Sequence, residues 1–473
     1  PGGRRPRIEN RMRLCVLAAL VGGAAPRDRE GARPAGARRR RLSDSATFKL
    51  LATRTASDAA PLRNYGFAVG VDGDTIVSGA PGCDPVLPGQ ESCPIIIGSV
   101  YVLRASDGEE LFKLTAADGA AGNFFGESLA IDGDTVVVGA RGDNNVTGAV
   151  YVFRASDGAQ LAKLTASDGA AGDHFGHSVA IDGDTVVVGA RGVNTQTGAA
   201  YVFRTTDGWD TFVEVDKLTA SDGSYEDLFG QSVAISGATV VVGASQSRKI
   251  PEGYCPSLDC SGAAYLFRTQ DEGASYGQMA KLTATDAAAG DSFGWSVAFD
   301  SGTVVVGAHS DNDACTDNPL CNSGAAYVYS LGDAGLVYTK LTAPDAAADD
   351  YFGVSVAIDG ETIVVGAYAK NLLTGAAYVY RASDDGATHD HVAKLTSPGA
   401  MGDAFGISVA VDGAAVVVGA GQWLNLGSGS AYVYEEIPQK TASSSQSAYN
   451  LTSDAARSLP AAATLLAAGA ALA

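Results

Sequence analysis

The chain has 473 residues, 59 of them glycine, with 46% hydrophobic residues and a formal net charge of −20. This composition is typical of a globular protein and excludes a fully disordered chain. The large acidic excess excludes the basic surface that a nucleic-acid-binding domain needs, and it favours high solubility.

The N-terminal segment differs in charge from the rest, because residues 1–41 contain 12 Arg and only 3 acidic residues. Arginines at positions 11 and 13 precede a short apolar stretch, 14–25, that ends in small residues. This pattern predicts a secretory signal peptide that is too short to span a bilayer. We therefore assign residues 1–41 to a signal peptide and basic linker. The arginine run 38–41 is either a processing site or a solvated part of that linker.

Seven near-copies of one unit follow. In each copy a Gly-Ala step begins 13 residues after the glycine of a Phe-Gly step, while the loops between the motifs vary in length. A fixed internal offset with variable loops indicates a repeated supersecondary unit, and a period of this size favours a propeller or an array. The Phe-Gly glycines are Gly66, Gly126, Gly176, Gly230, Gly294, Gly353 and Gly406.

Each copy consists of short segments of strand length, and its apolar residues do not recur with a helical period. In the second copy, residues 128–131 and 135–138 predict a hairpin around Asp132-Gly133, and 151–153 and 161–165 predict two further strands. The consecutive valines 136–138 indicate a strand that is covered on both faces. We therefore predict an all-β, seven-bladed β-propeller of four-stranded antiparallel blades.

The two ends of the repeat region predict how the ring closes. The last copy has its third strand at 431–434 and no fourth strand after it, while residues 48–53 form a strand with no preceding blade. We expect 48–53 to complete the last blade, which removes two exposed strand edges. The propeller is assigned to residues 42–437.

Residues 438–473 form a Ser-rich tail that ends in an uncharged, apolar stretch from residue 459. Small residues, a polar spacer and an apolar end match the signal for a GPI anchor, and we expect the membrane to be reached only through such an anchor. A frayed Ala-rich tail is the alternative.

Six cysteines outside the signal segment lie in the long loops between second and third strands. The spacing from the Gly-Ala glycine to the next strand's tyrosine is 20–22 residues in these copies and 12–13 in the others. Local disulfides fit an oxidising compartment better than zinc, since no pair has clustered histidines. The predicted pairs are Cys83–Cys93, Cys255–Cys260 and Cys315–Cys321.

Few residues suggest chemistry. The five histidines form no metalloprotease motif, no nucleophile elbow occurs, and we expect no enzymatic activity and no cofactor. The best local group of calcium ligands is Asp311, Asp313 and Asp317, which keeps a calcium site open as a weak alternative. Asn145 and Asn450 begin N-glycosylation sequons.

An acidic or amide residue precedes most Phe-Gly glycines by three positions, and we expect a turn or cap role for it. These residues are Asn123, Asp173, Asp227, Asp291, Asp350 and Asp403.

The repeated residues resemble FG-GAP repeats, the units of the integrin α-chain N-terminal β-propeller. Phe125-Gly126 and Gly139-Ala140 occupy the motif positions, the later copies match likewise, and the first copy has Tyr65-Gly66. The resemblance covers residues 48–436 and implies an extracellular, ligand-binding propeller. The calcium loops of integrin propellers are not carried over, because a tight turn at 132–134 stands in their place.

Strand direction places all the variable loops on one face, and function on a fixed scaffold usually lies on such loops. We therefore predict that a monomeric, secreted or GPI-anchored propeller binds an extracellular protein or glycan through loops 82–98, 245–261 and 310–323. A carbohydrate-active hydrolase or lyase, or a structural coat protein without a specific ligand, are the alternatives.

Overall fold

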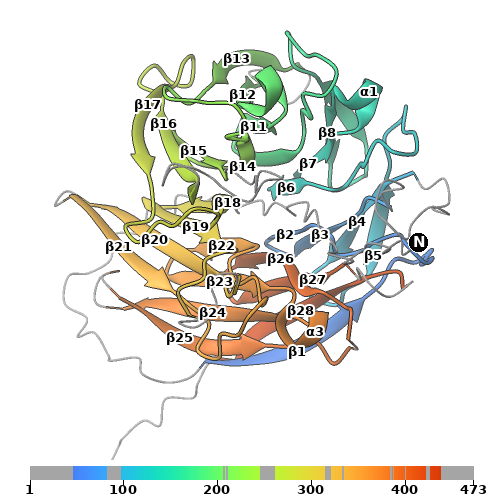
Figure 1. The fold of residues 1–473 in the computed structure, drawn as a ribbon. Coiled ribbons are helices and arrows are strands. Elements are labelled where there is room, and N and C mark those ends of the chain that lie inside the picture. Colours follow the sequence, from blue (N-terminus) through green and yellow to red (C-terminus); the bar gives the residue numbers. More distant parts are fainter. Residues whose placement is uncertain are drawn as a thin grey trace, which may run out of the picture. The chain divides into compact units, whose positions relative to one another are not determined.

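The computed structural model describes residues 46–82, 97–205, 208, 211–245, 261–314, 321–332, 335–383, 386, 388–399, 401–421 and 427–437. These residues form seven antiparallel sheets of four strands each, arranged around a common centre (Figure 1). The predicted fold class is confirmed.

The first four blades follow one another along the chain. Blade 1 contains β2 Val69–Asp72, β3 Thr75–Ala80, β4 Ser99–Arg104 and β5 Glu110–Leu114. Blade 2 contains β6 Leu129–Asp132, β7 Thr135–Ala140, β8 Ala149–Arg154 and β9 Gln160–Leu164. Blade 3 contains β10 Ser178–Asp182, β11 Thr185–Ala190, β12 Ala199–Arg204 and β13 Val213–Leu218. Blade 4 contains β14 Phe229–Ser236, β15 Thr239–Ala244, β16 Ala263–Arg268 and β17 Gly277–Leu282.

The last three blades complete the ring. Blade 5 contains β18 Phe293–Asp300, β19 Thr303–Ala308, β20 Ala325–Gly332 and β21 Gly335–Leu341. Blade 6 contains β22 Val356–Asp359, β23 Thr362–Ala367, β24 Ala376–Ser383 and β25 Thr388–Leu395. Blade 7 contains β26 Phe405–Asp412, β27 Ala415–Ala420, β28 Ser430–Ile437 and, from the other end of the propeller, β1 Thr47–Arg54.

Strand β1 closes the ring as the sequence predicts. It pairs antiparallel with β28, from Thr47 opposite Ile437 to Arg54 opposite Ala431. Blade 7 therefore takes its outermost strand from a segment that precedes the first blade, and Figure 1 shows the blue β1 beside the orange-red β28. The closing strand leaves no unpaired edge on β28.

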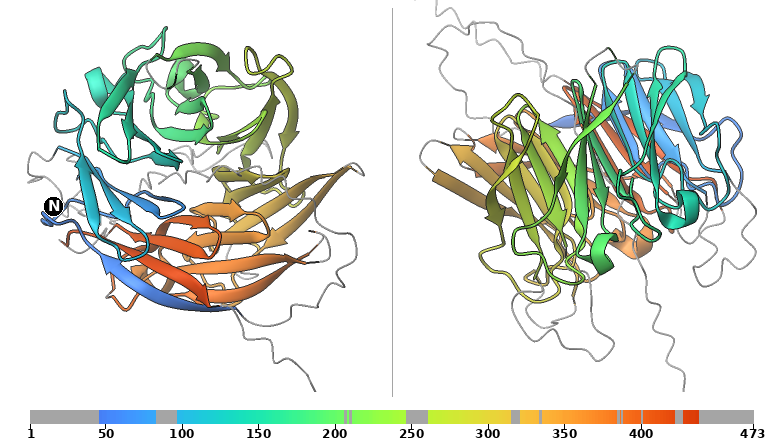
Figure 2. Two further views of the ribbon diagram at one scale, coloured as in Figure 1. Left: turned by 180° about the vertical axis from the view of Figure 1, so that it is seen from behind. Right: turned by 90° about the horizontal axis from the view of Figure 1, so that it is seen from above.

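The propeller has two faces that differ in their connections. The top face, as we use the term, carries the loops between second and third strands and the links between blades, and the bottom face carries the other turns. The short elements α1 Asp143–Val146, α2 Val193–Gln196 and α3 Lys370–Leu373 lie in top-face loops, and the edge-on view in Figure 2 shows them on one side. Their central residues have positive φ, so each is a left-handed turn rather than a regular helix.

The turn between first and second strands lies one residue later than the sequence suggests. Asp132 pairs with Thr135, so the loop residues are Gly133 and Asp134 rather than Asp132 and Gly133. Only Gly133 has a positive φ, at +56°, which fits a type II′ turn with glycine in its first position. The freed Asp132 carboxylate accepts a hydrogen bond from the Gly183 amide of the next blade at 2.7 Å.

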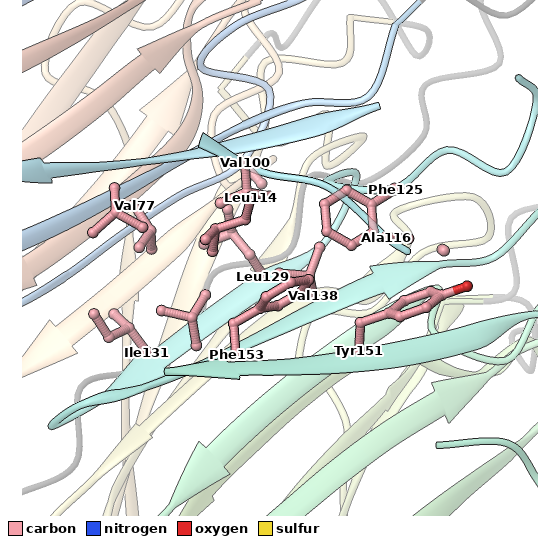
Figure 3. Close-up of a cluster of buried hydrophobic side chains, with 14 of the residues drawn as sticks. Val77, Val100, Leu114, Ala116, Phe125, Leu129, Ile131, Val138, Tyr151 and Phe153 are labelled. Carbon is pink, nitrogen blue, oxygen red and sulfur yellow. The ribbon is translucent and has the colours of Figure 1, made fainter. Parts of the chain in front are cut away.

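The hydrophobic core lies between adjacent blades, because each blade is apolar on both faces. Between blades 1 and 2, Val77 and Val100 face Leu129 and Val138, and the aromatic ring of Phe125 lies beside them (Figure 3). Similar clusters recur between successive blades around the ring. Within the part of the chain that the structure describes, no helix has the length and apolar character needed to cross a membrane.

Candidate ligand site at the top of the channel

The Phe-Gly and Gly-Ala steps hold neighbouring inner strands at backbone contact. A Cβ atom on Gly139 of blade 2 would lie 2.1 Å from the carbonyl oxygen of Gly176 in blade 3. Ser128 Oγ donates a hydrogen bond to the same carbonyl at 2.8 Å, and five further serines repeat this bond around the ring. Blade 1 differs, because Ala68 stands at the serine position.

Two positions next to these steps are directed toward the centre of the ring, and we call them the channel positions. One follows the Phe-Gly glycine and the other follows the Gly-Ala step. Side chains of the first kind from four different blades meet in one buried cluster, which places this position at the centre. The first position holds Phe67, Glu127, His177, Gln231, Trp295, Val354 and Ile407. The second holds Pro81, Arg141, Arg191, Ser245, His309, Tyr368 and Gly421.

Blades 2 to 4 supply a polar sector of the channel. The Arg141 Nε–H group donates to both carboxylate oxygens of Glu127, at 2.8 and 2.7 Å, and both side chains are buried. The Arg191 guanidinium donates to Gln231 Oε1 at 2.9 Å and so joins blade 3 to blade 4. His177 lies between these groups in the ring order and is fully buried.

Blades 5 to 7 and blade 1 supply an apolar and aromatic sector. The rings of Trp295 and His309 have their centroids 4.2 Å apart, and His309 stacks on Tyr351 at 5.7 Å. Tyr351 in turn contacts Tyr368 at 5.5 Å. Trp295 and Tyr368 also belong to the buried cluster that contains Phe67, so this sector is packed across the ring.

The polar sector has a positive electrostatic character. Burial, together with the positive charges of Arg191 and Arg141, lowers the pKa of His177 well below its usual value. The same causes lower the pKa of His174, at the entrance of blade 3, to about 3. Both imidazoles are therefore neutral at physiological pH, and neither adds a charge to the two guanidinium groups.

Several buried polar atoms of the channel positions have no hydrogen-bond partner among the described residues. They are Nδ1 and Nε2 of His177, Nε2 of Gln231, Oγ of Ser245, Nε1 of Trp295 and Oη of Tyr368. Buried polar groups in folded proteins are nearly always paired with protein, water or ligand. A group of such atoms at one level of the ring therefore marks this part of the channel as a candidate site.

In six of the seven blades, hydrogen bonds between a tyrosine, an aspartate and a lysine hold the blade to the chain segment that leads into it. In blade 2, Tyr151 Oη donates to Asp118 Oδ1 at 2.7 Å, and Lys163 Nζ donates to Asp118 Oδ2 at 2.6 Å. Six blades share this Tyr–Asp–Lys clamp, while blade 7 has a bond from Ser397 Oγ to Tyr432 Oη instead. The clamp fastens the top-face links and is structural.

The predicted calcium ligands lie at the clamp of blade 5. Carboxylate oxygens of Asp286, Asp311 and Asp313 lie within 4.8 Å of one another, a spacing that could hold a metal ion. Lys340 Nζ donates to all three, at 2.8, 2.9 and 2.6 Å, so an ammonium group takes the central position. The third predicted ligand, Asp317, lies outside the described residues.

The acidic residues before the Phe-Gly steps have the predicted turn role. Asp173 Oδ2 accepts the Ala170 amide at 2.7 Å, and Asp227, Asp291 and Asp350 form the same bond three residues back. In blade 2 the equivalent Asn123 instead donates to Asp143 Oδ1 at 2.7 Å. These side chains therefore order the links that lead into the inner strands.

The other predicted sites fall largely outside the described residues. This applies to most of loops 82–98, 245–261 and 310–323, to Asn450, and to five of the six paired cysteines. Cys321 is buried and disulfide-bonded, and its predicted partner Cys315 is outside the described part. Asn145 is exposed at the α1 turn on the top face, where a glycan would be accessible.

The sequence interpretation missed the channel positions. The histidines were considered only for enzymatic motifs, and the change of the residue after the Phe-Gly glycine from copy to copy was not used. The signal that could have identified them is the contrast with neighbouring positions. In blades 2 and 3, for example, glycine and serine flank Glu127 and His177 alike, while the residue between them changes its chemistry.

The comparisons with known proteins concern the repeat. The FG-GAP repeat family matches residues 105–153, 159–203, 212–267, 276–329, 338–380 and 390–434. Each match runs from the fourth strand of one blade to the third strand of the next. The last match therefore ends at the third strand of blade 7, and β1 supplies the fourth strand of that blade. No curated protein matches the chain significantly. Because the matched repeats cover more than half of the sequence and build a seven-bladed propeller, the chain belongs to the FG-GAP repeat family.

Proposed function

We propose that this protein is an extracellular binding propeller that recognises a protein or glycan ligand through its top face. The proposal assigns it no reaction, and it places the protein in a secreted or GPI-anchored, monomeric form. FG-GAP repeats are typical of extracellular and cell-surface proteins, which supports this location.

The observation that carries the proposal is the contrast between the loops that join second and third strands and the turns that join first and second strands. On the bottom face, all seven blades have a two-residue turn between first and second strands. On the top face, blades 2, 3 and 6 have short left-handed turns, and blades 1, 4 and 5 have longer loops. Packing of the ring alone gives no reason to vary the loops between second and third strands while the turns between first and second strands stay constant.

Exposed apolar side chains on the top face support a macromolecular ligand. Leu372 in the α3 turn is 76% exposed and Met401 in the following link is 60% exposed. The two segments adjoin, because the Leu373 carbonyl accepts the Gly402 amide at 3.1 Å. Blade 2 has Asn145 and blade 3 has Thr195 at the position of Leu372, so an apolar residue is not required by the turn.

The path of the chain fits an anchored protein. β28 ends at Ile437 on the bottom face, where it pairs with Thr47 at the start of β1. The last described residue before the predicted anchor signal therefore lies on the face opposite the variable loops, which is compatible with an anchored protein whose top face is open to ligand.

The test is binding of the recombinant propeller, residues 42–437, to glycan arrays and to intact cells. The top-face variant combines Leu372→Thr with Met401→Ala, and the matched control is Met279→Ala on the outer strand β17, where 59% of Met279 is exposed. We expect the top-face variant to weaken binding by about tenfold or more, and the control to bind normally.

A second variant shortens loops 82–98, 245–261 and 310–323 to the length of the blade 3 loop, and it should stay folded and lose binding. Equal binding by the parent and both top-face variants would contradict the proposal.

A further inference from the structure

We propose that His177, Arg191, Gln231 and Ser245 of the polar sector, together with the indole N–H of Trp295 at the adjoining edge of the aromatic sector, bind an oxyanion such as a carboxylate or a phosphate. Except for Ser245, which begins loop 245–261, the site lies outside the loops that are proposed to bind a macromolecule, and it can be occupied by a free small anion. The side chains of the site combine unpaired donors with a positive surrounding charge, and other blades have different residues at the same positions.

The first step concerns the direction of the donors. Gln231 Oε1 accepts a hydrogen bond from Arg191, so its amide N–H₂ group points away from the guanidinium. Gln231 is fully buried, and Nε2 has no acceptor within hydrogen-bond distance among the described residues; besides Arg191, Gln231 also interacts with the imidazole of His177 in the same sector. Trp295 occupies the same repeat position in the next blade, and its indole N–H is likewise buried without an acceptor.

The second step concerns neighbouring groups that can complete the site. Ser245 follows β15, the strand beside β14 that carries Gln231, and its hydroxyl is buried and unpaired within the described part of the chain. His177 lies one blade earlier, and in its neutral form it offers one N–H donor. The side chains from blades 3 to 5 therefore present several donors without protein acceptors, which is the arrangement an anionic oxygen needs.

Third, the charged groups of the polar sector leave an excess of positive charge. Burial, and after it the positive charges of Arg191 and Arg141, lower the pKa of His177, so a further positive charge is disfavoured there. The Glu127 carboxylate is bound on both oxygens by Arg141, so these two charges compensate each other. A bound anion beside Arg191 would lie in a buried, positive environment, where a charge-assisted hydrogen bond is stronger than in water.

The fourth step compares sectors of the same ring. Val354 and Ile407 occupy the position of Gln231 in blades 6 and 7, and both are fully buried in an apolar cluster. The fold therefore accepts apolar residues here, and burying unpaired polar groups costs stability that the ring does not require. Buried polar residues that lower the stability of the fold without a structural role are expected at functional sites.

The test uses the full-length chain with selectively ¹⁵N-labelled tryptophan indoles. The Trp295 resonance is assigned as the one that disappears in Trp295→Phe, since the chain has only 3 tryptophans. Sodium acetate and inorganic phosphate are titrated separately against sodium chloride at equal ionic strength. A chemical shift is preferred to a melting temperature, because phosphate stabilises many proteins by exclusion from their surfaces.

We expect a saturable shift of the Trp295 indole with acetate, with phosphate, or with both, and the response distinguishes a carboxylate source from a phosphate source. Gln231→Leu should weaken binding on the order of tenfold. Gln231→Glu, which keeps an acceptor for Arg191 but adds a negative charge, should abolish it. Ile407→Val is the matched control at the same repeat position and should bind like the parent.

Two results would overturn the proposal. One is the absence of any shift beyond the sodium chloride control, which would mean that only water occupies the sector. The other is unchanged binding in the folded Gln231→Glu variant, which would place the anion elsewhere. Because no macromolecular ligand is used, either failure leaves the proposed rim function to its own test.

Discussion

Two glycines of blade 2 are in different environments: Gly139 is in close contact with the next blade, and Gly133 lies in a turn with a positive φ. A Cβ atom on Gly139 would lie 2.1 Å from the Gly176 carbonyl oxygen and 2.1 Å from Ser128 Oγ. Gly133 has φ at +56°, and a Cβ atom there would meet nothing within 4 Å. Alanine at each position therefore tests one effect at a time.

The expected costs differ in size. Gly133→Ala should lower the free energy of unfolding by about 1–2 kcal/mol, the usual penalty for an L-residue in the left-handed region. Gly139→Ala should lower it by about 3 kcal/mol or more, at the upper end of overpacking effects. The reason is that the Gly176 carbonyl is backbone and cannot rotate away, so blades 2 and 3 must separate.

The assay is denaturant unfolding followed by tyrosine and tryptophan fluorescence, with the unfolding midpoint compared at constant slope. Gly133→Ala is the control for the general effect of replacing a glycine in this blade. If Gly139→Ala unfolds at the same or a higher denaturant concentration than Gly133→Ala, the close backbone contact between blades is not a determinant of stability, and the reasoning is wrong.

Three further predictions concern closure, protonation and the acidic cluster. Deletion of β1 should lower the melting temperature sharply in calorimetry, because β28 loses its paired edge, and an unchanged value would argue against closure. Burial raises the pKa of Asp291 from 3.8 to about 7; a backbone hydrogen bond from Ala288 opposes the shift, and the charges of Asp311 and Asp313 add to it. Between these two pH values the folded state keeps a proton that the unfolded state has lost, so the stability of the folded state falls as the pH rises. Asp291→Asn should flatten that fall in a pH series of melting temperatures, and an unaltered slope would refute the assignment. In Lys340→Met the three carboxylates of the acidic cluster lose the ammonium group, so added calcium should raise the melting temperature of this variant and leave that of the parent unchanged. A calcium response in the parent would show that Lys340 does not prevent calcium from binding to these carboxylates.

The repeat made most of the fold predictable. The constant offset between Phe-Gly and Gly-Ala steps fixed the inner hairpin of every blade, and the unmatched strand at residues 48–53 predicted closure, which β1 confirms. The hairpin turn was placed one residue early, because Asp-Gly was taken as the central pair. The actual pair is Gly133-Asp134, since Asp132 remains in the strand and reaches across to the amide of Gly183.

The channel site could not be predicted in the same way. The residue after a Phe-Gly glycine follows a backbone with positive φ, +91° at Gly126, so strand alternation does not give its direction. Its neighbours in space come from other blades, as the contact of Arg191 with Gln231 shows. Only closure of the ring brings these side chains together.

The bonds that hold the inner ring together explain why this variation is tolerated. Ser178 Oγ donates to the backbone carbonyl of Gly230, and Asp132 accepts from the backbone amide of Gly183. Neither bond involves the side chain that follows a Phe-Gly step, so that side chain can change without loss of these bonds to the backbone of the next blade. Substitutions there should therefore alter ligand binding more than stability, whereas substitutions at the serine and glycine positions should do the reverse. A polar sector in blades 2 to 4 beside an apolar one in blades 5 to 7 is the outcome expected when a uniform scaffold carries a local site.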